Sequence, residues 1–470
     1  MRSGWLAVIW LVGGCRSGFD DLSDARGRGD ANDARGDTGT VLDDASDGST
    51  DGSVPLTCTG RTPITGQTWW VATTGNDSNA GTQASPVATI TKAVTLASAT
   101  GGTVVVTPGA YTAEPGGELT IMTTKPLRVV SEQRYRASVP RIVCQTCTDL
   151  TIESFEVGGA SLPAISLNGG ARVTVLDNVV HDSGSAGIRV TSSADTIAVI
   201  GNLVYDNAAT DIHFNVTSNI TVRGNIVFNA TVSPNGLSKI WLEAAATAIV
   251  DGNIVFRERG NDNAYGVISL RATSATTIEN NIVAASPNAT SVFAPVGFNQ
   301  ASGSATIRHN TFVGPLPGNA FGIGVQSLSS GTYTFVNNVW ASSGTAQPFT
   351  SGTAPGGTIT VRHNLYWNAP NGPFTSGGSP NPTNDSESRV VDPGISFAAV
   401  PAAPTWSSST QQFAGGATTV CDVRTQLVQA LAALPATSPA VGGADPAQRP
   451  STDVLGKQRP NPATLGAYEP

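Results

Sequence analysis

Charged side chains are scarce in this chain, and lysine is almost absent. Only 13% of the 470 residues are Asp, Glu, Lys or Arg, and the four lysines are Lys92, Lys125, Lys239 and Lys457. The polar surface must therefore come from Thr, Ser, Asn and Gly, which favours exposed strands and turns over salt-bridged helices. Ten Asp and three Arg fall within residues 20–53, so about −1 of the net charge of −8 remains for the rest of the chain. This near-neutral remainder lacks the basic surface that nucleic-acid binding requires.

Long hydrophobic runs are also missing, and no stretch is long enough to span a bilayer. The N-terminus has Arg2, a short apolar run over 5–12 and then Val12-Gly13-Gly14-Cys15, which together indicate an export signal. The four residues Val12 to Cys15 resemble a bacterial lipoprotein cleavage box. The resemblance implies a signal peptide at 1–14, a lipid on Cys15 and attachment to the outer membrane or cell surface. The alternative is an ordinary secretory signal that contains a cysteine by chance.

Apolar residues are almost absent from 24–53, the centre of the segment 15–66, which is rich in Asp and Gly. Such a segment cannot bury a core, so we predict a disordered tether behind the lipid anchor. Asp-rich repeats can also form calcium-binding loops, but no fixed spacing is present here.

Cysteines are few, and four remain after Cys15: Cys58, Cys144, Cys147 and Cys421. An even number in an exported protein suggests disulfides, and three pairings are open. Cys144 and Cys147 form a C-x-x-C motif without the strand–helix pattern of a redox protein around it. A local disulfide or two free thiols are the interpretations that remain.

A short apolar phrase around an asparagine recurs along most of the chain. It reads VLDNVVHD at 175 and VRGNIVFN at 222, and its Asn falls at 178, 202, 225, 253, 281, 310, 338 and 364. An earlier copy at 151 places Ser154 in the same slot. A second strand follows each phrase, as in DIHF at 211 and KIWL at 239, with no helical period between. Each repeat is therefore predicted to be one coil of an all-β parallel solenoid, with equivalent strands stacked about 4.8 Å apart.

The repeated Asn has a physical role in such a solenoid. We predict that it bends the chain into the left-handed region at each corner and that its amide bonds to the next Asn in a ladder. This regularity makes the Asn series structural and not catalytic. His309 and His363 each precede a ladder Asn, and we expect them to be exposed corner residues.

The two ends of the chain carry family resemblances. From Trp69 the order is strand, polar loop, an amphipathic helix with Ile90, Val94 and Ala97 on one face, and a strand ending in Pro-Gly. This resembles the N-terminal segment, of the DUF1565 type, of right-handed parallel β-helix proteins in the pectate-lyase-like superfamily. The matching residues are Gly75, Asp77, Gly81, Thr82, Pro86, Ala88, Thr89, Ile90, Pro108, Gly109 and Tyr111.

The tail is similar to the C-terminal segment called choice-of-anchor Q. It matches at Ser438, Pro439, Gly442, Asp453, Gly456, Arg459, Gly466, Ala467, Tyr468 and Glu469, with Thr464 where the family has Asp. A short helix is expected over 421–436. We therefore predict a cap and first coil at 67–125, a right-handed parallel β-helix at 126–395 and a small terminal segment at 396–470. We expect the protein to be a monomer. These resemblances imply a fold but no chemistry, since the superfamily includes lyases, hydrolases, epimerases and non-enzymes.

Outward side chains of the second strand of each coil suggest a site for an acidic polysaccharide. Removing the proton beside a carboxylate needs a base and a cation. We assign Lys239 as candidate base, with Arg271 as its catalytic partner that neutralises the substrate carboxylate. Sugar contacts are assigned to Arg189, His213, Asn215 and Trp241, and a Ca²⁺ ion to Asp211 and Glu243.

The same residues also permit interpretations without catalysis. Asp211 with Lys239, and Glu243 with Arg271, fit cross-coil ion pairs on adjacent strands. The stripe is then a polysaccharide-binding surface without catalysis, or merely a solvated face. The sequence therefore predicts an exported, carbohydrate-active β-helix protein, either a polysaccharide lyase or a non-catalytic polysaccharide-binding or adhesion protein.

Overall fold

The computed structural model describes residues 61–191, 194–230, 238–258, 266–285, 292–299, 301–314, 320–325, 330–344, 347–348, 357–368, 385, 387–397 and 401–470. The chain divides into two compact units, Met1–Ser53 and Val54–Pro470, and every described residue belongs to the second. Cys15 and the Asp-rich segment therefore lie outside the described residues. Within the described ranges, no helix has the length and apolar character needed to cross a membrane.

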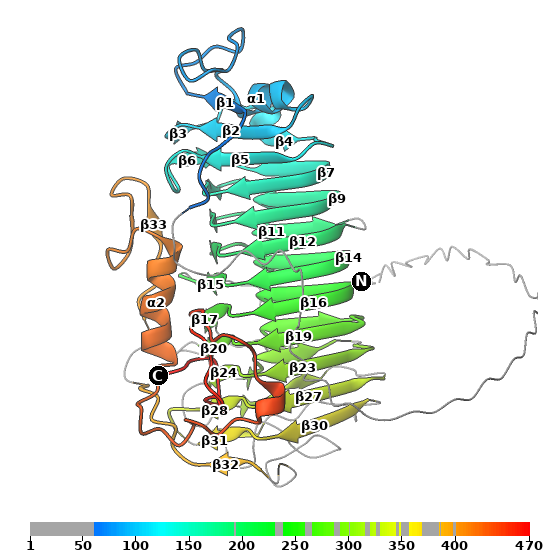
Figure 1. Ribbon diagram of the computed structural model, residues 1–470, viewed down its shortest axis with the longest axis vertical. Coiled ribbons are helices and arrows are strands. Elements are labelled where there is room, and N and C mark those ends of the chain that lie inside the picture. Colours follow the sequence, from blue (N-terminus) through cyan, green and yellow to red (C-terminus); the bar gives the residue numbers. More distant parts are fainter. Residues whose placement is uncertain are drawn as a thin grey trace, which may run out of the picture. The chain divides into compact units, whose positions relative to one another are not determined.

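The N-terminal cap contains the one helix that its sequence predicts. α1 (Ile90–Ala97) follows β1 (Thr68–Val71) and buries Ile90, Ala93, Val94 and Ala97. The Asp77 carboxylate accepts hydrogen bonds from the backbone N–H groups of Ala88 and Thr89 at 2.8 and 2.9 Å. The motif residue Asp77 thus fixes the entry to this helix, which covers the first coils (Figure 1).

The larger sheet has 17 strands, all in parallel pairings, and runs through the whole stack of coils. In four coils one 12-residue strand crosses a corner, as β16 does by bending at Ala244 with φ 51°. In other coils the two halves are separate strands. Besides β1, the strands are β2 (Gly102–Val106), β4 (Leu119–Ile121), β5 (Leu127–Ser131), β7 (Ile142–Glu153), β9 (Ile165–Leu176), β11 (Ile188–Thr191), β12 (Asp195–Ile200), β14 (Ile212–Arg223), β16 (Ile240–Asp251), β18 (Ile268–Arg271), β19 (Ala275–Glu279), β22 (Val296–Phe298), β23 (Ser304–Arg308), β26 (Gly324–Val325), β27 (Thr332–Val336) and β30 (Thr358–Arg362).

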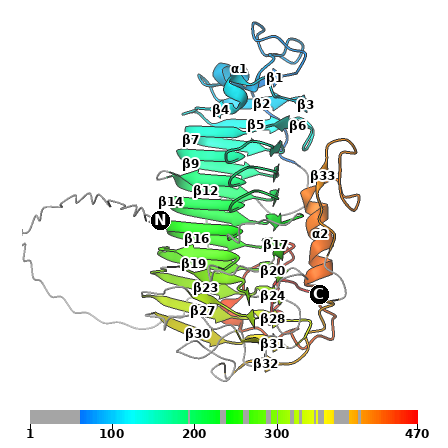
Figure 2. The same cartoon turned by 180° about the vertical axis from the view of Figure 1, so that it is seen from behind.

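A second sheet of 12 short parallel strands forms another side of the coils (Figure 2). Its strands are β3 (Gly109–Ala110), β6 (Ala137–Val139), β8 (Glu156–Gly158), β10 (Val179–His181), β13 (Leu203–Tyr205), β15 (Ile226–Phe228), β17 (Ile254–Glu258), β20 (Ile282–Ala285), β24 (Thr311–Val313), β28 (Val339–Ala341), β31 (Leu365–Trp367) and β32 (Arg389–Val390). The smaller pieces are β21 (Val292–Phe293), β25 (Ala320–Phe321) and β29 (Gln347–Pro348), the hairpin of β33 (Trp406–Ser407) and β34 (Gln412–Phe413), and the 3₁₀ turns η1 (Pro115–Gly117) and η3 (Pro446–Gln448). The fold is the predicted right-handed parallel β-helix.

The asparagine ladder is confirmed. Each ladder Asn is fully buried, and its backbone and side-chain N–H groups donate to Oδ1 of the next one at 2.8–3.0 Å. The last ladder residue, Asn364, donates in the same way to the carboxylate of Asp385 at 3.0 and 3.1 Å. A buried carboxylate thus replaces the missing next amide and ends the ladder.

Two details of the ladder differ from the sequence expectation. The left-handed conformation belongs to the residue before each ladder Asn, for example Gly224 at φ 65° and Asn280 at φ 55°. This placement leaves the Asn N–H groups free to point along the stack toward the next coil. In the first copy the ladder slot holds Phe155, not Ser154, because Glu153 is in register with Leu176 and the Phe155 N–H donates to Asn178.

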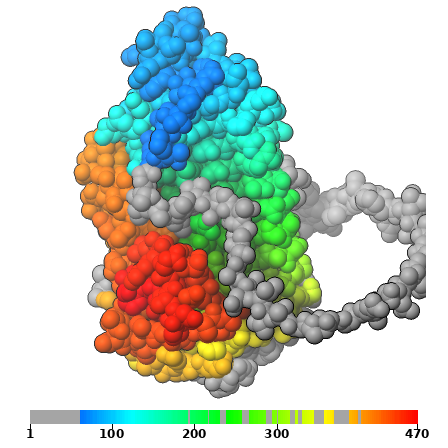
Figure 3. Space-filling model, in the orientation of Figure 1, coloured from blue at the N-terminus to red at the C-terminus, as the bar shows by residue number. Residues whose placement is uncertain are grey.

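The C-terminal segment covers part of the outer face of the 12-stranded sheet. α2 (Val420–Leu431) lies beside the short strands, and its apolar side packs on outward Leu203, Phe228 and Phe256 (Figures 1 and 2). The C-terminal residues form a continuous orange-to-red surface against the lower coils in Figure 3. The outer side of the short strands is therefore where the C-terminal segment of the same chain packs.

Residues of the C-terminal sequence motif hold that tail in place. The fully buried guanidinium of Arg459 bonds to the Glu469 carboxylate at 2.6 Å and to Oδ1 of Asn280 at 2.8 Å. Thr464 donates its hydroxyl to Glu469 at 2.6 Å. The tail also buries His309, which the sequence predicted to be exposed; its ring bonds to the Thr464 carbonyl at 3.1 Å. His363 is partly exposed and pairs with Glu387 at 2.8 Å.

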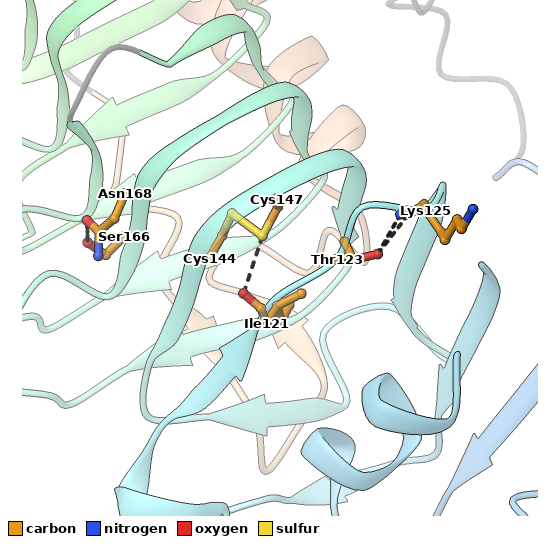
Figure 4. The surroundings of a disulfide bond; sticks show 7 residues. All are labelled: Ile121, Thr123, Lys125, Cys144, Cys147, Ser166 and Asn168. Carbon is orange, nitrogen blue, oxygen red and sulfur yellow. Dashed lines mark hydrogen bonds between the residues drawn. A yellow bond between two sulfur atoms is a disulfide. The ribbon is translucent and has the colours of Figure 1, made fainter. Parts of the chain in front are cut away.

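Cys144 and Cys147 are joined by a disulfide in β7. Both cysteines are fully buried, and Cys147 Sγ lies 3.3 Å from the carbonyl oxygen of Ile121 (Figure 4). Of the interpretations that the sequence left open, the local disulfide is therefore the one observed. The disulfide lies inside the coil and is part of the hydrophobic core.

Candidate functional site

Two columns of outward side chains run across four stacked strands. The strands are β11, β14, β16 and β18, whose alternate residues, such as Ile212 and Phe214, are fully buried in the core. The first column is Arg189, His213, Trp241 and Ser269. The second column is Asn215, Glu243 and Arg271. We call the two columns together the polar face.

Aromatic stacking organises the first column. The rings of His213 and Trp241 are stacked, with centroids 5.1 Å apart and planes 19° apart. Two neighbours carry buried polar atoms without a hydrogen-bond partner: Nε of Arg189 and Oγ of Ser269. Ser269 is fully buried and out of reach of a surface ligand, whereas the Arg189 side chain is partly exposed and offers it a cation.

The second column is dominated by charge pairing. The Glu243 carboxylate forms an ion pair with Arg271 and accepts a contact from His213 Nε2 at 3.1 Å. The Arg271 side chain is 39% exposed, whereas those of Glu243 and His213 are each 15% exposed. Glu243 therefore links the two columns and leaves Arg271 as the cation most open to solvent.

The surroundings of His213 favour its uncharged form. Burial lowers the pKa of His213 below its ordinary value, the contact with Glu243 opposes this shift, and the positive charge of Arg189 adds to it. A neutral imidazole retains one nitrogen that can accept a proton or a hydrogen bond.

Lys239 and Asp211 do not lie on the polar face, which corrects the sequence expectation. Lys239 is 2% exposed and Asp211 is fully buried, with Nζ and Oδ2 3.1 Å apart. Each residue precedes the first residue of its strand, where the corner and not the strand alternation sets the side-chain direction. Lys239 therefore cannot reach a polymer on the surface, and it is excluded as the base.

The residues predicted to hold calcium do not fit that ion. Asp211 is enclosed by Lys239 and by Nδ2 of Asn207 at 2.9 Å, while Glu243 is engaged by Arg271 and His213. Calcium prefers about six to eight oxygen ligands. In the part of the chain that the structure describes, no three His, Cys, Asp or Glu side chains are grouped to hold a metal.

The sequence did not reveal the hydrogen-bond partners of the buried pair Lys239 and Asp211, or a hollow elsewhere on the surface. Asn207 and Asn229 bond to Asp211 and Lys239 from the loops before the strands, where no repeat marks them. A hollow of about 190 Å³ lies on the outer face of β8, lined by Thr112, Ser138, Val139, Pro140, Glu156, Gly158 and His181. Burial opposes protonation of His181, but Glu156 and Asp182 raise its pKa above the ordinary value.

The stacked coils and their capping helix define a parallel β-helix protein. Residues 73–343 match the family described as "Protein of unknown function (DUF1565)", and the chain belongs to that family. Among solved structures, pectate lyase Pel9A aligns with a TM-score of 0.51 at 16% identity, over 86% of this chain and 96% of that one.

Two further structures align less closely. A rhamnogalacturonan lyase has a TM-score of 0.41 at 14% identity, over 64% of this chain and 87% of that one. XylC in complex with xylose has a TM-score of 0.41 at 10% identity, over 70% and 87%. No curated protein matches the sequence. These likenesses concern the fold, so the function has to be argued from the polar face.

Proposed function

We propose that the chain binds an acidic polysaccharide along the polar face. The observation that carries this proposal is the partly exposed Arg189, which is in register with the stacked pair of His213 and Trp241. A guanidinium matches the planar geometry of a carboxylate, and an aromatic ring offers a flat apolar surface to a sugar. Arg271, one coil beyond Trp241, supplies a second exposed cation for the same polymer. The names of the aligned lyases are consistent with a carbohydrate ligand.

The test is binding of the purified protein to polygalacturonate, alginate and chondroitin sulfate, measured by affinity electrophoresis. We expect Arg189→Gln to weaken binding roughly tenfold or more, since a hydrogen bond to a charged group contributes about 1.5–3 kcal/mol. Arg172→Gln is the matched control. Arg172 lies on the second half of β9, away from the polar face, where it pairs with Asp149 of β7 and is 58% exposed. Equal binding by both variants, or no binding to any polymer, contradicts the proposal.

A second candidate activity is β-elimination in the bound polymer, with His213 as the base. It is favoured by burial, which lowers the pKa of His213, and by the nearby charge of Arg189, since this chemistry needs an uncharged base beside a cation. Incubation with the same three polymers should then raise the ultraviolet absorbance of unsaturated uronates. His213→Gln should abolish this rise and weaken binding less than Arg189→Gln does, because the cation remains. The absence of product from the unaltered protein leaves binding alone.

We also propose that the protein is exported and anchored through a lipid on Cys15, which lies outside the described residues. The support is the sequence Val12-Gly13-Gly14-Cys15 after a short apolar run. In this proposal the chain after Cys15 connects the β-helix to the membrane, and an extracellular polymer can reach the polar face. Arg61 already belongs to the folded body, since its side chain pairs with Glu153 at 3.2 Å.

A further inference from the structure

A buried polar cluster lies at the corner that leads into β14 and β16. Its members are Asn207, Asp211, Asn229 and Lys239, none more than 6% exposed. Lys239 Nζ donates to Oδ1 of Asn229 at 2.9 Å and lies 3.1 Å from Oδ2 of Asp211. Asn207 Nδ2 donates to the other oxygen of Asp211 at 2.9 Å. An amine, an amide and a carboxyl group thus meet in the interior.

This arrangement is costly as a plain ion pair. Removing an ammonium and a carboxylate from water has a penalty that their attraction offsets only in part, so a buried pair is weak support for stability. Burial raises the pKa of Asp211, and the charge of Lys239 opposes that rise. Transfer of one proton from Lys239 to Asp211 removes both charges and leaves a neutral amine, which is a nucleophile.

The amine is also close to an electrophilic carbon. Because a C=O bond is about 1.23 Å long, Cγ of Asn229 lies within about 4 Å of Lys239 Nζ. This is near the separation of about 3–3.5 Å at which a nucleophile and its target carbon react. The carboxyl group of Asp211 lies 3.1 Å from the same Lys239 Nζ, where it can move protons between Lys239 and Asn229.

We propose that Lys239 and Asn229 join in an intramolecular isopeptide bond, with Asp211 as the acid that assists its formation. The Lys239 amine attacks Cγ of Asn229, and protonated Asp211 stabilises the developing oxyanion. The Cγ–Nδ2 bond then breaks, and one proton from the attacking nitrogen passes through Asp211 to the leaving group, which departs as ammonia. Asp211 returns to its starting state, and no oxidant or cofactor is required.

The bond explains why lysine, so rare in this chain, occurs inside the solenoid. It replaces the ammonium by a neutral amide and closes the ten-residue span from Asn229 to Lys239 between β15 and β16. Such a link constrains the unfolded chain as a disulfide does, and it withstands reduction. The inference stands apart from the proposed function, because it concerns residues that do not reach the polar face.

The experiment is mass spectrometry of a tryptic digest of the full-length protein. Trypsin cleaves after Arg223, Lys239 and Arg257, so an unmodified chain yields the peptides 224–239 and 240–257. With the bond present, cleavage at Lys239 is lost and one peptide, 224–257, appears about 17 Da lighter than its sequence mass. Its fragment spectrum should contain no backbone cleavage between Asn229 and Lys239.

Variants separate this bond from other losses of ammonia, such as succinimide formation at Asn235-Gly236. Lys239→Gln and Asn229→Ala should each restore the full sequence mass, and Asp211→Asn should leave Lys239 open to trypsin. Complete cleavage at Lys239 in the unaltered protein overturns the proposal. So does a mass loss that persists in Lys239→Gln, or a loss of about 18 Da that joins peptide 190–223 to 224–257 through Asp211.

Discussion

Replacing one residue of the asparagine ladder should destabilise the protein strongly. Asn253 is fully buried in the middle of the ladder. Its Oδ1 accepts from the backbone and side-chain N–H groups of Asn225, both at 2.9 Å. Its Nδ2 donates to the Val222 carbonyl at 2.8 Å and to Asn281 at 2.9 Å. Asn253→Ala removes all four hydrogen bonds, and at about 1 kcal/mol net each the free energy of unfolding should fall by about 4 kcal/mol.

The matched control is Asn219→Ala in β14. Asn219 is exposed and bonds to Asp195 at 3.0 Å and Thr247 at 2.6 Å, so its loss should cost less than about 1 kcal/mol. Guanidinium unfolding followed by circular dichroism measures both variants, and hydrogen exchange shows whether protection is lost in β15, β17 and β20. If Asn253→Ala is no less stable than Asn219→Ala, the ladder does not hold the coils together.

Three further predictions concern other parts of the chain. The pKa of His309 is held well below its ordinary 6.5, first by burial and then by the charges of Arg459 and Arg308, so the unfolded state binds more protons below that pH. Stability should therefore fall on acidification below about 6.5, and His309→Gln should flatten the pH dependence of the unfolding midpoint; an unchanged slope refutes this. Deleting 401–470 should expose the apolar outer faces of β13, β15 and β17 and cause self-association in light scattering, and a monodisperse monomer contradicts that role. Cys15→Ser should release the protein from membranes on fractionation, and an unchanged membrane fraction argues against the lipid anchor.

The sequence predicts the scaffold well because its signals repeat. The recurrence of the ladder Asn every 23–29 residues sets which strands stack, and alternation within a strand sets which side chains face outward. His213, Trp241 and Glu243 therefore lie in the predicted register. The cap helix was predictable from Ile90, Val94 and Ala97 because its apolar spacing is local.

The sequence fails where direction or burial depends on non-local contacts. Lys239 stands one residue before its strand, so alternation does not apply, and its partner Asn229 comes from a loop without a repeat. His309 resembles an exposed corner residue until the tail, more than a hundred residues later, covers it. In both cases a polar residue looked like surface because nothing nearby in sequence shows what buries it.

The central claim is that the polar face is where a polysaccharide binds, and a crystal structure with a bound acidic oligosaccharide tests it most directly. We expect the sugar to lie across β11 to β18, with a carboxylate or hydroxyl oxygen accepting from the partly exposed Arg189 guanidinium and a ring against Trp241. An oligosaccharide bound elsewhere, for instance in the hollow beside His181, with the polar face empty, contradicts the account.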